Sequence, residues 1–149
     1  MDKTWLIDSA RALPPVSAAA AEEYSRQGER LAEAVSNALR QRADLEALVG
    51  RNNLAMMQDN HANHARFIAS ILQRPNADVL VESVLWVFRA YRSHGFSANY
   101  WAAQLNAWFR VLPSQLTAES WTEIRPYYEW LQVNIPLFVA LTDKVQEGQ

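Results

Sequence analysis

Two of the three histidines in this chain stand one helical turn apart in the segment DNHANH, residues 59–64. Imidazoles at positions i and i+3 of a helix can hold one metal ion together, and Met57 or Asp59 lies close enough in sequence to contribute. The full metal motifs are absent, because neither His61 nor His64 follows a glutamate by three residues and no His-Glu-x-x-His occurs. The ordinary interpretation of the pair is structural, with one histidine hydrogen bonded in the core and the other facing solvent.

A haem site is the main cofactor alternative. Haem requires one axial histidine, an apolar pocket and basic groups for its propionates. Any of the histidines could supply the ligand, and three arginines lie near them in sequence: Arg66, Arg89 and Arg92. An all-helical chain of this length is compatible with a globin-like arrangement. We prefer a protein without a cofactor and keep haem, or a metal held by His61 and His64, as the alternative.

Few other residues could act in catalysis. The chain has no cysteine, no Gly-x-Ser-x-Gly turn and only four glycines, which are too far apart for a phosphate-binding loop. Glu82 lies in the apolar run VLVESVLWVF, where a buried carboxylate would have a perturbed pKa, although the exposed edge of a helix is the simpler interpretation. Tyr127 and Tyr128 could offer hydroxyls to a ligand. The sequence therefore predicts a non-catalytic protein.

Aromatic residues are numerous and unevenly placed. Six tryptophans, five tyrosines and five phenylalanines occur among 149 residues, and all but Trp5 and Tyr24 lie between Phe67 and Phe138. Half of the chain is apolar, which is enough for the core of one domain. Arginines flank Tyr91, but a net charge of −2 gives no general attraction to nucleic acid or anionic membranes. We expect a cytoplasmic protein, because the sequence shows no secretory signal and no membrane-spanning stretch.

Hydrophobic periodicity predicts helices along most of the chain. We expect an N-terminal arm over residues 1–16, because the proline pair at 14–15 favours extended chain and excludes helix before it. Ser17 then caps the first helix of a single helical domain, residues 17–149. Gly28 lies on the buried stripe of that helix, where it permits the close approach of a bulky neighbour.

Glycines and prolines mark the later helix boundaries. Gly50 and Gly95 supply the left-handed conformation that closes a helix. Pro113 ends another helix, and Pro126 and Pro136 kink or split the last segment. After the first helix, the expected helical segments are residues 43–49, 53–73, 79–93, 98–112 and 117–145. We therefore predict an all-α bundle of five to six helices.

The central part of the chain carries an ordered series of motifs: NHANHARFIASIL, then Leu85-Trp86-Val87-Phe88-x-x-Tyr91, a His94-Gly95-Phe96 break, and Leu105-x-x-Trp108. This series resembles the helical module that accompanies vitamin B12-binding domains in corrinoid proteins and regulators. In that family, cobalamin lies between the module and a separate α/β domain whose Asp-x-His-x-x-Gly loop supplies the lower ligand. Here His64 stands where the glycine of that loop should be, and 149 residues contain no α/β domain. The resemblance implies a fold and a concave aromatic surface, without a cobalamin ligand.

The chain is also similar in outline to non-haem globin-like sensor domains, which bind an apolar ligand or a partner. Both resemblances imply a sensory or regulatory helical module. We predict an aromatic-lined pocket among the helices at 53–73, 79–93, 98–112 and 118–144. The residues expected to line it are His61, His64, Trp86, Tyr91, Trp101, Trp108 and Tyr128.

The expected occupant of this pocket is a small apolar ligand or a protein partner. Binding is expected to shift the segment that contains Pro126 and Pro136, since broken helix hydrogen bonds lower the cost of movement. A competing hypothesis is a homo-oligomer in which exposed aromatic side chains form the interface.

Overall fold

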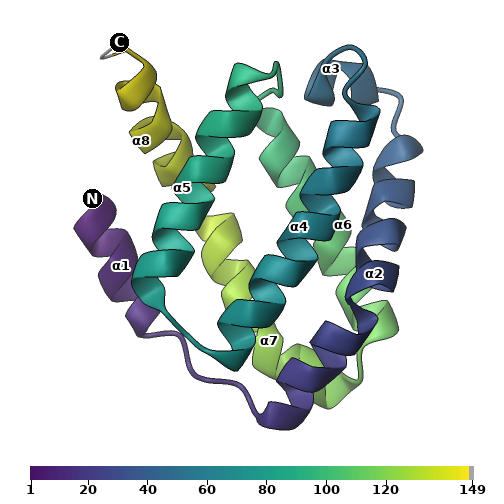
Figure 1. Cartoon of the computed structure of the whole chain (residues 1–149), viewed down its shortest axis with the longest axis vertical. Coiled ribbons are helices and arrows are strands. Elements are labelled where there is room, and N and C mark those ends of the chain that lie inside the picture. Colours follow the sequence, from purple (N-terminus) through teal and green to yellow (C-terminus); the bar gives the residue numbers. More distant parts are fainter. Residues whose placement is uncertain (148–149) are drawn as a thin grey trace.

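A computed structural model describes the backbone of residues 1–147 and the side chains of residues 1–143. This part of the chain contains eight helices and no strand, so the all-α prediction is confirmed. The helices are α1 (Lys3–Arg11), α2 (Ala18–Arg40), α3 (Leu45–Val49), α4 (Leu54–Gln73), α5 (Ala77–Ser93), α6 (Asn99–Gln115), α7 (Ala118–Val133) and α8 (Ile135–Glu147) (Figure 1). The predicted count of five to six was too low, because the first sixteen residues include α1 and the last segment forms both α7 and α8.

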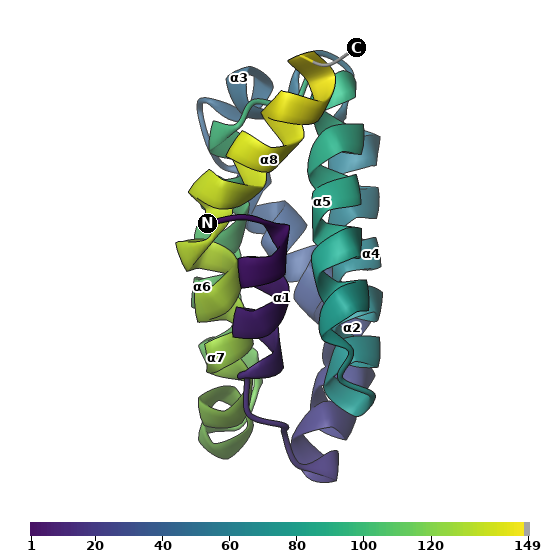
Figure 2. The same cartoon turned by 90° about the vertical axis from the view of Figure 1, so that its left-hand side faces the viewer.

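The helices form two layers. Seen from the side, α4 and α5 lie in one layer and α6 and α7 in the other, α8 crosses from α7 toward the upper end of α5, and α1 covers the near edge (Figure 2). Helix α2 packs against α4, α6 and α7 and so joins the layers, whereas α5 packs mainly against α1 and α8. The core of the described residues is therefore dense around α2 and less closely packed beside α5.

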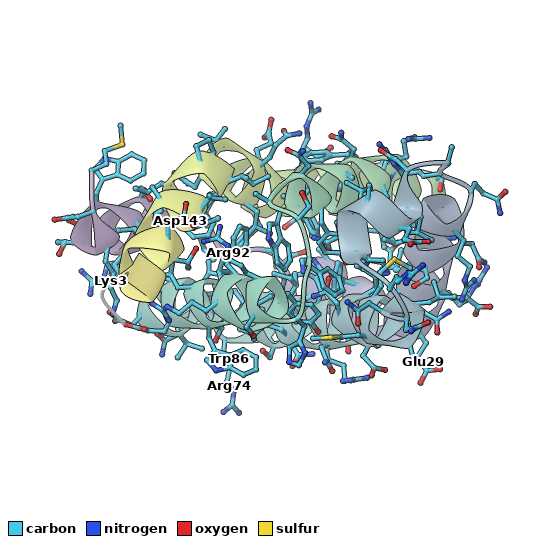
Figure 3. All side chains as sticks on the ribbon, turned by 90° about the horizontal axis from the view of Figure 1, so that it is seen from above. Lys3, Glu29, Arg74, Trp86, Arg92 and Asp143 are labelled. Carbon is cyan, nitrogen blue, oxygen red and sulfur yellow. The ribbon has the colours of Figure 1, made fainter. Side chains whose placement is uncertain are left out.

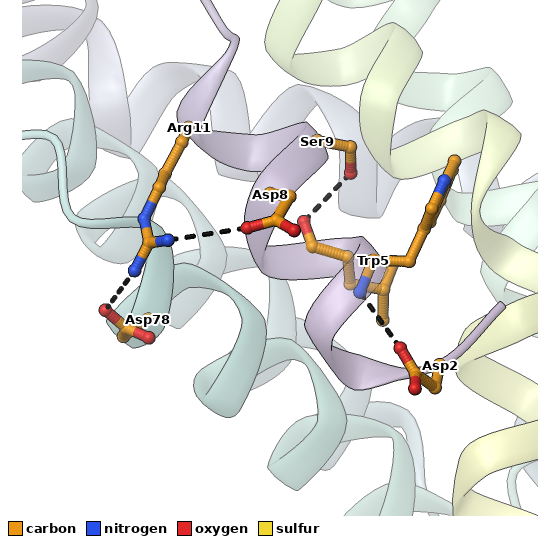
Figure 4. Close-up of polar contacts among 7 residues, drawn as sticks. Asp2, Trp5, Asp8, Ser9, Arg11 and Asp78 are labelled. Atoms are coloured by element: carbon orange, nitrogen blue, oxygen red, sulfur yellow. Dashed lines mark hydrogen bonds and ion pairs between the residues drawn. The ribbon is translucent and has the colours of Figure 1, made fainter.

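The prediction that residues 1–16 form an extended arm was wrong. Asp2 accepts a hydrogen bond from the backbone N–H of Trp5 and caps α1, and Leu6 on that helix is fully buried (Figure 4). The proline pair constrains only the residues immediately before it, and α1 ends at Arg11, which leaves room for the turn. The helix is stable there because its apolar face is covered by the rest of the domain.

Polar contacts fix the position of α1. The indole N–H of Trp130 in α7 donates to the Ser9 hydroxyl at 2.9 Å. Arg11 lies within ion-pair distance of Asp8 on its own helix and of Asp78 in α5 (Figure 4). These ion pairs are exposed and contribute little, so the burial of Leu6 and the indole contact account for most of the attachment.

The N-termini of α2 and α7 cap each other. Ser17 and Thr117 are the N-cap residues of these helices, and each stands six positions before a glutamate. The carboxylate of Glu123 accepts hydrogen bonds from the backbone N–H and hydroxyl of Ser17, at 2.7 and 2.9 Å. Glu23 accepts the corresponding pair from Thr117, at 2.7 and 2.9 Å, and a further bond from the Ser120 hydroxyl. The predicted cap at Ser17 is confirmed, and its partner lies in a distant helix.

Two turns meet at the opposite end of the bundle. The amide nitrogen of Asn53 donates to the carbonyl oxygens of Val49 and His94, at 2.7 and 2.8 Å. Gly50 and Gly95 adopt φ values of 86° and 96°, which confirms the predicted left-handed positions. The Asn53 side chain therefore ties the turn before α4 to the turn after α5.

Prolines interrupt the C-terminal helices less uniformly than predicted. Helix α6 continues through Pro113 to Gln115, because the proline removes only a hydrogen bond in the last turn. Pro126 likewise lies inside α7. The predicted split occurs at Asn134, where α7 ends two residues before Pro136.

Gly28 contacts no bulky aromatic residue, contrary to the prediction. A Cβ added to it would lie 3.8 Å from the Cβ of Ala65 in α4, which is an ordinary contact. The position lies between two closely packed helices that meet through small residues.

Candidate functional site

A cavity lies between α4, α5 and α6 and is also bordered by side chains from α7 and α8. Its volume is about 570 Å³, in the range of pockets for small organic ligands. The cavity exists because large aromatic side chains separate α5 from α6, while α5 packs closely only against α1 and α8. Its apolar lining is formed by Phe67, Ile68, Val84, Val87, Phe88, Trp101, Leu105, Leu131 and Phe138.

A cluster of rings builds one wall. Phe88 of α5 stacks on Trp101 of α6 with ring centroids 4.2 Å apart, and it meets Phe138 of α8 edge to face at 5.3 Å. Tyr91 approaches Trp101 edge to face at 5.9 Å. Because these rings come from three helices, their mutual packing holds the wall in place without an occupant.

His64 is one of the polar residues that border the cavity. Its ring lies against Trp108, with centroids 4.6 Å apart, and its Nε2 lies 2.9 Å from the hydroxyl of Tyr128. That hydroxyl lies 2.6 Å from the hydroxyl of Tyr24. Burial lowers the pKa of His64 to about 3, so the imidazole is neutral at physiological pH although the residue borders the cavity.

His61 has a different environment from its neighbour. It is fully buried and does not border the cavity. Its Nδ1 lies 2.8 Å from the Ser36 hydroxyl and its Nε2 lies 2.9 Å from the Tyr100 hydroxyl. Burial, with smaller contributions from His64 and Arg40, lowers the pKa of His61 to about 3. Both ring nitrogens are occupied, and a metal ion could bind only by breaking one of these hydrogen bonds.

The structure separates the predicted pocket residues into two groups. His64, Trp86, Tyr91 and Trp101 border the cavity, whereas His61, Trp108 and Tyr128 lie behind its wall. Trp86 is 62% exposed, and its ring points outward from α5 at the edge of the cavity (Figure 3). Trp108 and Tyr128 contact the ring of His64, whereas His61 is connected to Asn60 through the Tyr100 hydroxyl.

Two buried polar residues of the cavity were missed. Asn60 and Gln104 are both only 4% exposed and both border the cavity. The amide oxygen of Asn60 accepts from the Tyr100 hydroxyl at 2.6 Å, and that of Gln104 accepts from the Trp108 indole N–H at 2.8 Å. The signals in the sequence were their positions, one residue before His61 and one helical turn before Trp108.

Charged groups at the cavity differ in their pairing. Glu82 is paired with Lys3 of α1, and its side chain is 54% exposed, which agrees with the expectation of an exposed helix edge. Arg92, which does not border the cavity, is paired with Asp143 of α8 (Figure 3). Arg89 also borders the cavity, and its Nε is buried without a hydrogen-bond partner among the described side chains. The positive charge of Arg89 therefore lies at the cavity, although its unpaired Nε–H is itself sealed from the cavity space.

Neither a metal-binding cluster among the described residues nor a similar known protein indicates the function of the cavity. Within residues 1–143, no three His, Asp or Glu side chains gather closely enough to hold a metal ion. No protein-family model, no curated protein and no solved structure matches the chain. The resemblances to B12-associated modules and to globin-like sensors stay predictions, and the function has to be argued from the site.

Proposed function

We propose that this chain is a non-catalytic sensory or regulatory module that binds a small apolar molecule in the cavity between α4, α5 and α6. The observation that carries the proposal is the combination of about 570 Å³ of space, walls of aromatic and aliphatic side chains, and a few buried polar groups. Ligand sites in helical bundles have this composition, because apolar area supplies affinity and a small number of polar atoms orient the ligand.

The same cavity offers a route from binding to a signal. Leu131 of α7 and Phe138 of α8 both border it, and they lie on either side of the helix break at Asn134. An occupant that contacts both side chains favours one angle between the helices, and α8 transmits the difference to a partner. A globin-like arrangement of the helices would allow the same change in helix angle to reach a partner.

A neutral fluorescent probe tests the binding proposal. N-phenyl-1-naphthylamine should bind the wild-type protein and be displaced by members of a panel of apolar compounds, and native mass spectrometry should detect one bound molecule. Ser83→Trp fills the cavity from α5 and should weaken binding by about tenfold or more. Val79→Trp is the control, since Val79 is exposed on the same helix and does not border the cavity.

Two results of the probe experiment would contradict the proposal. If wild type binds neither the probe nor any panel member, or if both variants bind it equally, the cavity is not a ligand site. Titration with haem is run in parallel: a Soret band that depends on His64 would favour the cofactor alternative instead.

An exposed apolar face supports homo-oligomer formation as a second candidate. Val79 and Trp86 lie two turns apart on α5 and are 45% and 62% exposed. Self-association through this face would bury both. Sedimentation equilibrium of wild type and Trp86→Ala distinguishes the candidates, because a monomeric wild type excludes this interface. No helix of the described part of the chain is long and apolar enough to cross a bilayer.

A further inference from the structure

The buried polar groups of the cavity wall share one property: their acceptor atoms are already occupied from behind. The amide oxygens of Asn60 and Gln104 receive hydrogen bonds from Tyr100 and Trp108. An amide oxygen can only accept, so the directions of both bonds are fixed. The groups that remain for a ligand are the NH₂ nitrogens, which can only donate.

The hydroxyls of Tyr24 and Tyr128 behind His64 lead to the same conclusion, that the group left for a ligand is a donor. Each hydroxyl has one hydrogen, and each hydrogen needs an acceptor. If Tyr24 donates to Tyr128 and Tyr128 donates to Nε2 of His64, each hydroxyl hydrogen of the chain has an acceptor. In the reverse direction, the Tyr24 hydroxyl would have no acceptor among the described residues, which is costly for a fully buried group. The first direction therefore holds, and His64 carries its proton on Nδ1.

A second chain of hydrogen bonds supports the direction at Asn60. Tyr100 has one hydroxyl hydrogen, and it donates to the Asn60 oxygen. The Tyr100 oxygen is then free to accept from Nε2–H of His61, whose Nδ1 accepts from Ser36. Every donor along this path is satisfied, and the path ends at the Asn60 NH₂ group.

These donor ends are open to the cavity. Nδ1 of His64 and Nε2 of Gln104 have no hydrogen-bond partner among the described residues, and the NH₂ group of Asn60 has only the Tyr91 hydroxyl, which itself borders the cavity and leaves the second amide hydrogen available. None of the three nitrogens is among the polar atoms that are sealed from solvent and unpaired. Since all three residues border the cavity, its space is what these atoms face. Arg89 adds a positive charge that has no ion pair within residues 1–143.

We infer that the natural ligand is an apolar monocarboxylate whose carboxylate is held by the donors of Asn60, His64 and Gln104; this rests on the proposed function of the cavity. A carboxylate accepts several hydrogen bonds and donates none, so it matches a wall of donors, and charge-assisted bonds are the stronger kind. An alcohol forms only neutral hydrogen bonds with these donors, and such bonds are weaker than those to a carboxylate. An ammonium group meets donors and the Arg89 guanidinium, and the carboxylate at the cavity, Glu82, is already paired with Lys3.

A series of compounds with one chain and different head groups tests the inference. Decanoate, methyl decanoate, decanol and decylamine are compared at pH 7.5 by displacement of N-phenyl-1-naphthylamine. Decanoate should bind at least about tenfold more tightly than the alcohol, with the ester between them and the amine weakest.

Gln104→Glu is the matched variant, because its carboxylate keeps an oxygen for Trp108 and replaces the donor nitrogen with a second acceptor. It should lose most of the preference for decanoate while still binding the neutral probe. Gln132→Glu makes the same charge change at an exposed site in α7 and should behave as wild type.

The outcomes separate the two proposals. If the neutral probe does not bind wild type, the function of the cavity is wrong. If the probe binds but decanol equals decanoate, or the amine binds best, only the head-group inference is wrong. If Gln104→Glu retains the full preference for decanoate, the donor wall does not select the ligand, and the inference fails on that ground as well.

Discussion

The hydroxyl of Tyr128 lies 2.9 Å from Nε2 of His64, and this contact connects the buried core to the wall of the cavity. Tyr128 is fully buried, and its own hydroxyl is held by Tyr24 at 2.6 Å. Burial raises the pKa of both tyrosines, so they stay protonated and act only through neutral hydrogen bonds. The pair therefore orients His64 and decides which of its nitrogens faces the cavity.

The two neighbouring histidines should be opposite tautomers. The hydrogen-bond directions place the proton of His64 on Nδ1 and the proton of His61 on Nε2. Nitrogen-15 NMR of the imidazole rings distinguishes the forms in the free protein, with each histidine as the internal control for the other. Tyr128→Phe should shift His64 toward a mixture of tautomers and leave His61 unchanged. Identical tautomers at both positions would contradict the hydrogen-bond directions.

Acid should destabilise the protein through the same histidines. The pKa of His61 is lowered from 6.5 to about 3, so between pH 6.5 and pH 3 the unfolded chain binds a proton at this residue and the folded chain does not. The contribution of neutral His61 to the free energy of unfolding is fully present above pH 6.5 and falls as the pH decreases toward 3. Between pH 7 and pH 5, His61 alone should account for a loss of about 2 kcal/mol in the free energy of unfolding. Urea unfolding at both pH values measures this loss.

Two variants isolate the contribution of His61. His61→Gln should be less stable at pH 7, because the contacts with Ser36 and Tyr100 are disturbed, but its stability should depend less on pH. His94→Gln changes an exposed histidine and should keep the wild-type pH dependence. An unchanged pH dependence in His61→Gln would show that other groups cause the acid sensitivity.

Local sequence signals predicted most helices well. The boundaries of α4 and α5 fall within about two residues of the expected segments, because periodicity and the asparagine and glycine signals act locally. Helix α1 was missed, since its stability depends on the burial of Leu6 and on Trp130 far along the chain. The reciprocal caps at Ser17 and Thr117 were invisible for the same reason, as each joins residues about one hundred positions apart.

The candidate site was predicted in part. Tyr91 and Trp101 were found because large aromatic residues on buried helix faces tend to line cavities when they cannot fill them. Trp108 was placed one layer too close to the ligand, since periodicity gives the face of a helix but not the depth of a side chain. Asn60 and Gln104 were missed, because the role of an amide depends on which of its atoms the core already occupies.

The reciprocal caps should contribute measurably to stability. Glu23→Gln leaves a neutral amide in place of a carboxylate that accepts from Thr117 and Ser120, so we expect a loss of about 1 kcal/mol in the free energy of unfolding. The hydrogen bonds from Ser120 and Thr117 lower the pKa of Glu23, so this contribution is present at neutral pH and is lost as pH falls below about 4.5. Urea unfolding at pH 7 tests the value.

Glu22→Gln is the control for this substitution. Glu22 is exposed and faces only Arg26 on its own helix, at 3.8 Å. Its replacement should change stability by less than about 0.5 kcal/mol. If the two variants lose the same amount, the caps between α2 and α7 add nothing beyond general surface charge.

Replacing glycine with alanine should change the free energy of unfolding in opposite directions at Gly28 and Gly50. Gly28 lies inside α2, and an added Cβ would lie 3.8 Å from Ala65, so Gly28→Ala should raise the free energy of unfolding by about 0.5 to 1 kcal/mol. Gly50 has a φ of 86°, and an added Cβ would lie 3.1 Å from the Asn53 amide and 3.3 Å from the carbonyl oxygen of Gly95. Gly50→Ala should therefore lower it by about 1 kcal/mol or more.

Thermal and urea unfolding of the two variants give a direct comparison, because the chemical change is identical and only the local geometry differs. The Gly50→Ala loss should be accompanied by weaker protection of backbone amides at the turn that Asn53 ties to the end of α5, as seen by hydrogen exchange. A stabilised Gly50→Ala variant would mean that this turn relaxes freely and does not constrain the junction of α4 and α5.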